Sequence, residues 1–272
     1  MALFVVRHQH DAGDCPAKDP SMGAMLLNHL SRPNVRRHGL ELVRIPGPGA
    51  KAVAEMSFAM MLALSRNLFE FDRLTRQGHW AKHELTSYLL TGKTLGIVGT
   101  GNIGALTGQR AVAWGMKAIG CVSEPTPDVA ADLLAKGIRL ADFEEVLARS
   151  DYVSVHVPLT SATRNMINAT ALARMKPGSY LINLARGGVV DEMALYQALS
   201  SGHLRGAALD VHAKEGTGMI SPLAGLKNVI LTPHVGAETI DSQHEIGDTV
   251  IQTIATFVRR QAAAAVSAER IQ

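Results

Sequence analysis

Cysteine, aromatic side chains and net charge are all scarce in this chain, and each shortage argues against a class of protein. The 272 residues include two cysteines, Cys15 and Cys121, which lie far apart and not in the spacing of metal ligands. We therefore expect two reduced thiols in a cytoplasmic protein, and no metal site. Aromatic residues make up 4% of the chain, and the formal charge of +3 comes without a run of lysine or arginine. This composition argues against nucleic-acid binding, which needs a basic surface and stacking side chains.

A hydrophobic run long enough to cross a membrane is also missing. The apolar segment at residues 52–64 is interrupted by Glu55 and Ser57 and falls short of the roughly 18–20 residues that a span needs. We interpret it as the buried part of one long helix over residues 52–71. Residues 1–6 form an apolar run too short for a signal peptide, so we expect no membrane association.

What the chain does contain is an alternation of short apolar runs with helical segments over residues 94–232. Helix starts are indicated by Asp142 with Glu145 and by Asp191, and a helix end by Gly137. Strands that are apolar on both faces and separated by helices indicate an α/β fold with a doubly wound parallel sheet. The runs predicted as strands cover residues 94–98, 118–122, 152–155, 180–184, 206–209 and 229–231.

One predicted strand–helix junction carries a pattern typical of phosphate binding. Residues 95–104 read Leu-Gly-Ile-Val-Gly-Thr-Gly-Asn-Ile-Gly, a strand that ends in Gly-x-Gly-x-x-Gly. Gly99 allows the tight turn, Gly101 leaves room for a pyrophosphate, and Gly104 lets the following helix pack closely on the sheet. The pattern predicts a dinucleotide site in a Rossmann-type domain. The backbone amides predicted to face the anion are those of the first helical turn, near Asn102 and Ile103.

Three polar segments follow the last three predicted strands, and a parallel sheet places such segments at one edge. Arg186 follows the first of these strands, Glu215 the second and His234 the third. Arginine can hold a substrate carboxylate with two hydrogen bonds, and histidine can exchange a proton near neutral pH. A carboxylate bonded to the imidazole would orient it and favour the imidazolium. Each residue alone also fits a structural role, as a strand-end cap, a solvated acid or a loop residue.

In these segments the chain resembles the D-isomer-specific 2-hydroxyacid dehydrogenases, the family that includes D-3-phosphoglycerate dehydrogenase. The resemblance extends over residues 38–258 and includes Leu-Thr-Gly-Lys-Thr-Leu-Gly-Ile-Val-Gly at 90–99 and Val-His-Val-Pro-Leu-Thr at 155–160. It implies that Arg186 binds the substrate, that His234 donates the proton and that Glu215 is its partner. It also implies a homodimer formed through the cofactor domain. The residues that it implies along the nicotinamide cleft or adenine pocket are Val157, Leu184, Ala185, Asp210 and Gly236.

The sequence departs from the family pattern at the end of the second strand of the predicted domain. The family has an aspartate there that binds the adenosine ribose, and this chain has Val122, followed by Ser123 and Glu124. Glu124 could replace that contact. Because residues 122–127 contain no arginine to bind a 2′-phosphate, we expect NAD rather than NADP.

The second departure is a short N-terminal region, in which the family's glycine-rich substrate loop is not recognisable. We expect residues 1–50 to be a remnant of the substrate domain, a reduced flavodoxin-like lobe. Residues 51–235 are then the NAD-binding domain, and residues 236–272 a C-terminal helix that returns to the substrate domain.

Together these features predict an NAD-dependent oxidoreductase. It would transfer a hydride between nicotinamide and a small D-2-hydroxy acid or 2-keto acid of the 3-phosphoglycerate, hydroxypyruvate or glyoxylate type. The alternative is a truncated, catalytically impaired family member that binds the cofactor and has a dimerisation or regulatory role.

Overall fold

A computed structural model describes the backbone of residues 3–7, 40–44 and 49–269, and side chains within residues 49–260. Its internal contacts divide the chain into two units. The larger unit contains residues 49–237, and the smaller contains residues 1–48 and 238–272. The residues with predicted functional roles all fall within the larger unit.

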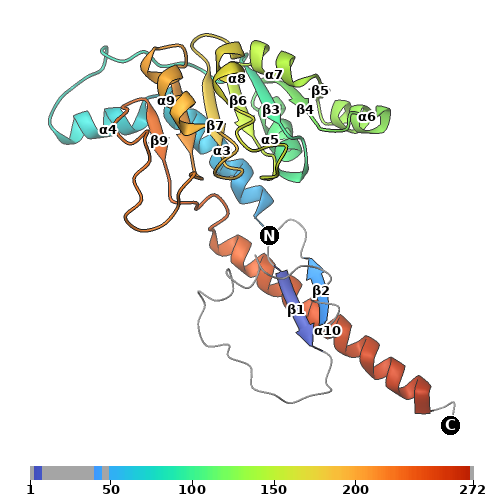
Figure 1. The fold of residues 1–272 in the computed structure, drawn as a ribbon. Coiled ribbons are helices and arrows are strands. Elements are labelled where there is room, and N and C mark those ends of the chain that lie inside the picture. The colour runs from blue at the N-terminus through green and yellow to red at the C-terminus, as the bar shows by residue number, and fades with distance from the viewer. Residues whose placement is uncertain (1–2, 8–39, 45–48, 270–272) are drawn as a thin grey trace. The chain divides into compact units, whose positions relative to one another are not determined.

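The larger unit is built on a seven-stranded sheet in the order β5-β4-β3-β6-β7-β8-β9 (Figure 1). Every pairing in this sheet is parallel. The first strand, β3, lies inside the sheet, and the chain adds strands on one side of it and then on the other. This arrangement confirms the predicted doubly wound α/β fold, in which ligands bind at the carboxyl ends of the strands near the reversal. The strands are β3 (Thr94–Val98), β4 (Lys117–Cys121), β5 (Ile138–Leu140), β6 (Tyr152–Val155), β7 (Tyr180–Asn183), β8 (Gly206–Leu209) and β9 (Val229–Leu231).

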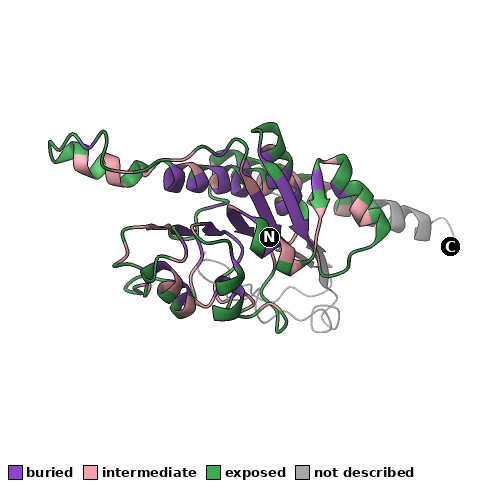
Figure 2. Cartoon of the chain, turned by 90° about the horizontal axis from the view of Figure 1, so that it is seen from above, coloured by how far each residue is buried: buried purple, intermediate pink, exposed green. Residues whose placement is uncertain are grey.

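Helices cover both faces of this sheet, and the two hydrophobic cores lie between them and the strands. Figure 2 shows most of the strands as buried and the outward helix faces as exposed. This double burial explains why most strand positions are apolar on both faces and do not alternate with polar ones. One face carries α3 (Ala50–Ser65), α5 (Asn102–Ala113) and α6 (Pro127–Ala135), and the other carries α7 (Phe143–Arg149), α8 (Ala169–Arg174) and α9 (Glu192–Ser200).

The polar residues predicted to begin helices do so through their side chains. Asp142 accepts a hydrogen bond from the amide of Glu145 at 2.7 Å, at the start of α7. Asp191 accepts bonds from the amides of Met193 and Ala194, both at 3.0 Å, at the start of α9. These contacts satisfy amides that have no partner within the helix.

The prediction of one long helix over residues 52–71 is wrong, because the structure has two helices there. α3 ends at Ser65, and α4 (Leu68–Arg76) begins after Asn67. Asn67 adopts a left-handed conformation, with φ of 51°, which asparagine tolerates better than most residues. Its side-chain amide donates to the carbonyl of Thr86 at 2.9 Å, and this contact holds the break.

In the smaller unit, β1 (Leu3–Arg7) pairs with β2 (Leu40–Arg44) in antiparallel register. The same unit contains α10 (Ile240–Glu269). Residues 1–2, 8–39 and 45–48 of the predicted substrate lobe lie outside the described residues. Among the helices that are described, none is both long and apolar enough to span a membrane.

Candidate active site

The glycine turn after β3 has the close packing that its sequence predicted. Gly99 has φ of +94°, a left-handed conformation that favours glycine. A methyl group at Gly104 would lie 2.1 Å from the carbonyl oxygen of Gly99, so only glycine lets α5 begin so close to the turn. At Gly101, by contrast, an added methyl would meet no atom within 4 Å. The turn is therefore closed on the protein side and open where a ligand could approach.

The start of α5 is suited to bind an anion. Within the described chain it has no side-chain cap and no acidic residue in its first turn. Its first intrahelical bond runs from the amide of Ala105 to the carbonyl of Gly101 at 2.8 Å, which leaves the amides of Asn102 and Ile103 without helical partners. The buried hydroxyl of Thr100 also has no partner among the described residues. Unpaired donors at a helix N-terminus fit the diphosphate of a dinucleotide.

His234 and Glu215 form a direct pair at the carboxyl ends of β8 and β9. The Nδ1 atom of His234 lies 3.0 Å from Oε2 of Glu215. The other oxygen, Oε1, accepts a bond from the backbone amide of His212, also at 3.0 Å. Partial burial by itself would raise the pKa of Glu215, but the bonds from His234 and from the His212 amide outweigh it and lower that pKa. The carboxylate is thus held charged and aimed at one nitrogen of the imidazole.

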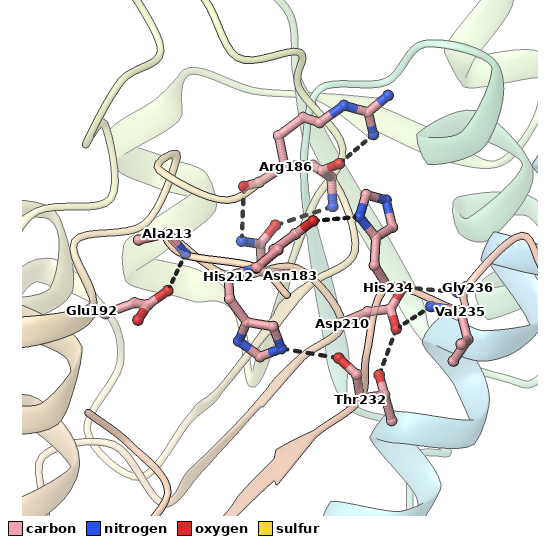
Figure 3. Close-up of polar contacts among 12 residues, drawn as sticks. Asn183, Arg186, Glu192, Asp210, His212, Ala213, Thr232, His234, Val235 and Gly236 are labelled. Atoms are coloured by element: carbon pink, nitrogen blue, oxygen red, sulfur yellow. Dashed lines mark hydrogen bonds and ion pairs between the residues drawn. The ribbon is translucent and has the colours of Figure 1, made fainter. Parts of the chain in front are cut away.

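The loop that carries His234 is held by a buried acid (Figure 3). Asp210, which is 1% exposed, accepts bonds from the amides of Val235 at 2.9 Å and Gly236 at 2.7 Å. Its own carbonyl accepts a bond from the amide of His234 at 2.7 Å. His234 has φ of 59°, an uncommon conformation for a residue other than glycine. These bonds hold that backbone conformation and so fix the position of the Cβ atom from which the imidazole extends.

Arg186 lies on the loop after β7, and this loop is shaped by the buried Asn183. The side-chain oxygen of Asn183 accepts from the amide of Ala185 at 3.1 Å, and its side-chain amide donates to the carbonyl of Arg186 at 3.3 Å. Arg186 is an exposed residue, and its guanidinium donates to the carbonyl of Ala185 at 2.6 Å. Its remaining donors are available for a carboxylate.

The arginine loop is packed against the loop that carries Glu215. A methyl group at Gly187 would lie 1.7 Å from the carbonyl oxygen of His212, so these two backbones are in contact. His212 in turn bonds Glu215, which bonds His234. The structure therefore brings Glu215 and His234 into direct contact and places Arg186 on an adjoining loop, without a polar contact to either in the described part of the chain.

The other predicted residues line the same edge of the sheet. A methyl group at Gly99 would lie 2.7 Å from a Val157 methyl, and one at Gly236 would lie 2.8 Å from Oδ2 of Asp210. Leu184 and Ala185 are buried at the end of β7. A cavity of about 720 Å³ adjoins the His234–Glu215 pair and gives small molecules room to reach it.

Three polar residues at this edge were not singled out from the sequence. Asn183 and Glu192 are buried and bond the loops that carry Arg186 and Glu215. His156, next to Val157, bonds the hydroxyl of Ser154 at 2.8 Å, and burial lowers its pKa to about 4, so the ring is neutral. Asn183 and His156 stand directly at strand ends, and that position was the available signal. Glu192 begins a helix, where a glutamate is ordinary.

The second strand ends without an acid at the expected place. β4 ends at Cys121, a free and buried thiol, and Val122 follows it partly buried. Glu124 is exposed, and residues 122–127 include no lysine or arginine. No cluster of three or more residues able to hold a metal ion occurs within the described ranges.

A family model and individual relatives both match this chain to one protein family. The family described as "D-isomer specific 2-hydroxyacid dehydrogenase, NAD binding domain" matches residues 58–236. D-3-phosphoglycerate dehydrogenase of Mycobacterium leprae is 41% identical over 216 residues, which are 79% of this chain and 40% of that protein. Hydroxypyruvate reductase of Thermotoga maritima is 37% identical over 231 residues, 84% of this chain and 73% of that protein. This chain thus spans about two fifths of the length of the first relative.

Solved structures agree with these matches. D-lactate dehydrogenase from Aquifex aeolicus, complexed with NAD and lactic acid, has a TM-score of 0.71 and 34% identity, covering 79% of this chain and 68% of that one. An acyclic imino acid reductase in complex with NADPH and D-Arg has a TM-score of 0.70 and 30% identity, covering 79% and 67%. The chain belongs to the D-isomer-specific 2-hydroxyacid dehydrogenases, and its larger unit carries the NAD-binding domain of that family.

Proposed function

We propose that this chain is an NAD-dependent oxidoreductase that interconverts a small D-2-hydroxy acid and its 2-keto acid. The observation that carries the proposal is the 3.0 Å bond between His234 and Glu215, at the same sheet edge as the glycine turn. A histidine held by a carboxylate is suited to general acid–base chemistry, and the turn is suited to a dinucleotide.

His234 is the proposed proton donor and acceptor. Because Nδ1 is bonded to Glu215, Nε2 is the nitrogen left to serve the substrate. In reduction, it donates a proton to the keto oxygen, and in oxidation it takes the hydroxyl proton. Glu215 fixes the orientation of the ring. Such catalysis contributes about 10²–10⁴ in rate.

Arg186 is the proposed anchor for the substrate carboxylate. Its guanidinium presents a planar fork of donors, and two of them can bind both oxygens of a carboxylate. In the structure one arm donates to the carbonyl of Ala185. We expect that a bound carboxylate competes for this arm and turns the side chain toward the substrate.

The cofactor would be held by the glycine turn and by the crevice beside it. Gly99, Gly101, Gly104 and the amides of Asn102 and Ile103 would take the diphosphate. When bound, the nicotinamide supplies or accepts the hydride. The residues proposed along its crevice are Val157, Leu184, Ala185, Asp210 and Gly236.

We propose NAD in preference to NADP. The segment that would meet the ribose carries Glu124, and Asp128 lies in the first turn of α6. A 2′-phosphate there would meet two acids and no cation, which is unfavourable. With Val122 in place of an acid, the ribose hydroxyls have Glu124 as the remaining carboxylate partner in this segment.

We also propose the domain arrangement and a homodimer. Residues 51–235 would bind the cofactor, whereas residues 1–50 and 236–272 would belong to the substrate side.

The proposed homodimer is supported by exposed apolar side chains on and after α4. This helix contains no buried residue, and Leu68 and Phe69 on it are 52% and 63% exposed. Trp80 after it is 81% exposed. A short helix with apolar side chains and no core of its own favours a partner, and a second copy of this chain is the proposed one.

The test is oxidation of NADH by the purified full chain with hydroxypyruvate, glyoxylate and pyruvate. We expect loss of the reduced-cofactor absorbance with at least one of these keto acids. NADH binding without turnover on a broad keto-acid panel would instead favour the non-catalytic alternative. Absence of NADH binding would contradict both.

A further inference from the structure

Glu192 makes a hydrogen bond that its position in a helix does not require. It is the first residue of α9 and is 9% exposed. Its Oε1 atom accepts a bond from the amide of Ala213 at 2.6 Å, across to the loop after β8 (Figure 3). The N-terminus of α9 is already capped by Asp191, which takes the amides of Met193 and Ala194. The carboxyl of Glu192 therefore serves another segment.

This bond is one of three contacts that join the arginine loop to the loop that carries Glu215. The amide of Asp210 donates to the carbonyl of Asn183 at 3.0 Å. The backbone of Gly187 lies against the carbonyl of His212. Glu192 adds the third contact, at Ala213. Residues 183–192 therefore run alongside residues 210–213 and contact them at three points. Arg186 stands within the first segment, and Glu215 stands two residues beyond the second.

Beyond Ala213 the loop has little packing of its own. Residues 213–220 are all exposed, and Gly216 and Gly218 have φ of +124° and +83°. Within this loop Glu215 must bond both the His212 amide and His234, each at 3.0 Å. A fixed backbone at Ala213 restricts where Glu215 can lie, because Glu215 is only two residues further along the chain. It thereby lowers the conformational entropy that Glu215 loses when it makes both bonds.

We propose that Glu192 is a positioning residue: it holds the backbone at Ala213 so that Glu215 stays bonded to His234 beside the Arg186 loop. The consequence for catalysis rests on the function proposed above. The consequence for the His234–Glu215 bond does not, and it can be measured in the protein without cofactor or substrate.

The test compares three substitutions in the full chain. Glu192→Gln keeps an oxygen acceptor for Ala213, whereas Glu192→Met keeps the volume and removes the acceptor. Glu144→Met is the matched control, since it makes the same substitution in the first turn of α7, where the carboxyl pairs with Arg174 outside the proposed site. Glu192→Ala replaces Glu192→Met if circular dichroism shows that the methionine variant does not fold.

The first readout is the Nδ1–H proton of His234 in ¹⁵N NMR spectra, assigned with His234→Gln. A proton held by Glu215 gives a downfield signal, which is recorded at low temperature so that its exchange with water at this partly exposed pair is slow. We expect this signal in the wild type, Glu192→Gln and Glu144→Met, and its loss or broadening in Glu192→Met. Retention of the signal in Glu192→Met, at wild-type position and width, would overturn the proposal.

The second readout is kinetic. We expect kcat to fall about 10- to 100-fold in Glu192→Met, since small misplacements of catalytic groups have effects of this size. The KM for NADH should stay within about twofold of the wild-type value, because Glu192 makes no proposed contact with the cofactor. Glu192→Gln should have the kcat of the wild type. Unchanged kcat in Glu192→Met contradicts the proposal. If the wild type shows the NMR signal but no turnover, the proposed function is wrong. The NMR comparison of Glu192→Met with the wild type then still tests the positioning role of Glu192.

Discussion

Two acidic residues at the site satisfy their hydrogen-bonding groups in different ways. Glu215 accepts bonds from His234 and from the amide of His212, and Asp210 accepts bonds from the amides of Val235 and Gly236. Both acids lie within loops, yet one is buried and holds backbone, and the other is partly exposed and holds an imidazole. The difference in burial separates an acid that holds a loop backbone from one that orients the proposed proton donor.

Glu215 should make stability depend on pH in a defined direction. Its pKa is lowered in the folded state, so its contribution is present above the ordinary value of 4.5 and is lost as pH falls through the folded value. We expect wild type to be more stable than Glu215→Gln at pH 7, and the gap to shrink below pH 4.5. Urea unfolding of both proteins across this range measures it. A gap that grows in acid would contradict the assignment.

Val122 should limit the affinity for NADH. An aspartate at this position could bond the ribose hydroxyls, and hydrogen bonds to charged groups are worth about 1.5–3 kcal/mol. We therefore expect Val122→Asp to tighten NADH binding at least about tenfold, measured by fluorescence titration. NADPH titrated into the same protein is the control and should bind no better. Equal gains for both cofactors would place residue 122 away from the ribose.

At the scale of elements, the glycine turn and α5 act as one unit with two different glycine requirements. Gly104→Ala puts a methyl 2.1 Å from the Gly99 carbonyl, and such overpacking costs about 1–3 kcal/mol of unfolding free energy. Gly101→Ala meets no atom within 4 Å and has ordinary φ of −67°.

We therefore expect Gly104→Ala to lower stability and Gly101→Ala to leave it unchanged within about 0.5 kcal/mol. Gly101→Ala should still weaken NADH binding, because the methyl would occupy the space of the diphosphate. Denaturant unfolding and NADH titration on both variants separate the two effects. Full NADH affinity in Gly101→Ala would contradict the placement of the diphosphate.

Elements with strong local signals were predictable from the sequence, and those defined by tertiary contacts were not. Asp142 and Asp191 mark helix starts because a cap depends on neighbours in the chain. The break at Asn67 depends on Thr86, and the three-residue β5 exists because β4 pairs with it. The site shows the same limit. Strand ends indicated Arg186, Glu215 and His234, but the bond from the amide of Ala213 to Glu192 joins residues 21 apart and has no sequence pattern.

At the scale of the whole molecule, the exposed apolar side chains on and after α4 require an explanation. Figures 1 and 2 show α4 at the periphery of the larger unit, and Phe69 and Trp80 are 63% and 81% exposed. If a second copy covers them, the chain should have the mass of a dimer in light scattering after size exclusion. We expect Phe69→Ser with Trp80→Ser to shift it to a monomer, while the exposed-charge control Arg76→Ser stays dimeric. A monomeric wild type would contradict the proposed dimer.

The most direct measurement compares wild type and His234→Ala for both NADH binding and keto-acid reduction on the same samples. We expect His234→Ala to bind NADH as the wild type does and to lose a factor of about 10²–10⁴ in turnover, because the imidazole supplies the proton and lies outside the proposed diphosphate site. Wild-type turnover in His234→Ala would contradict this role of His234.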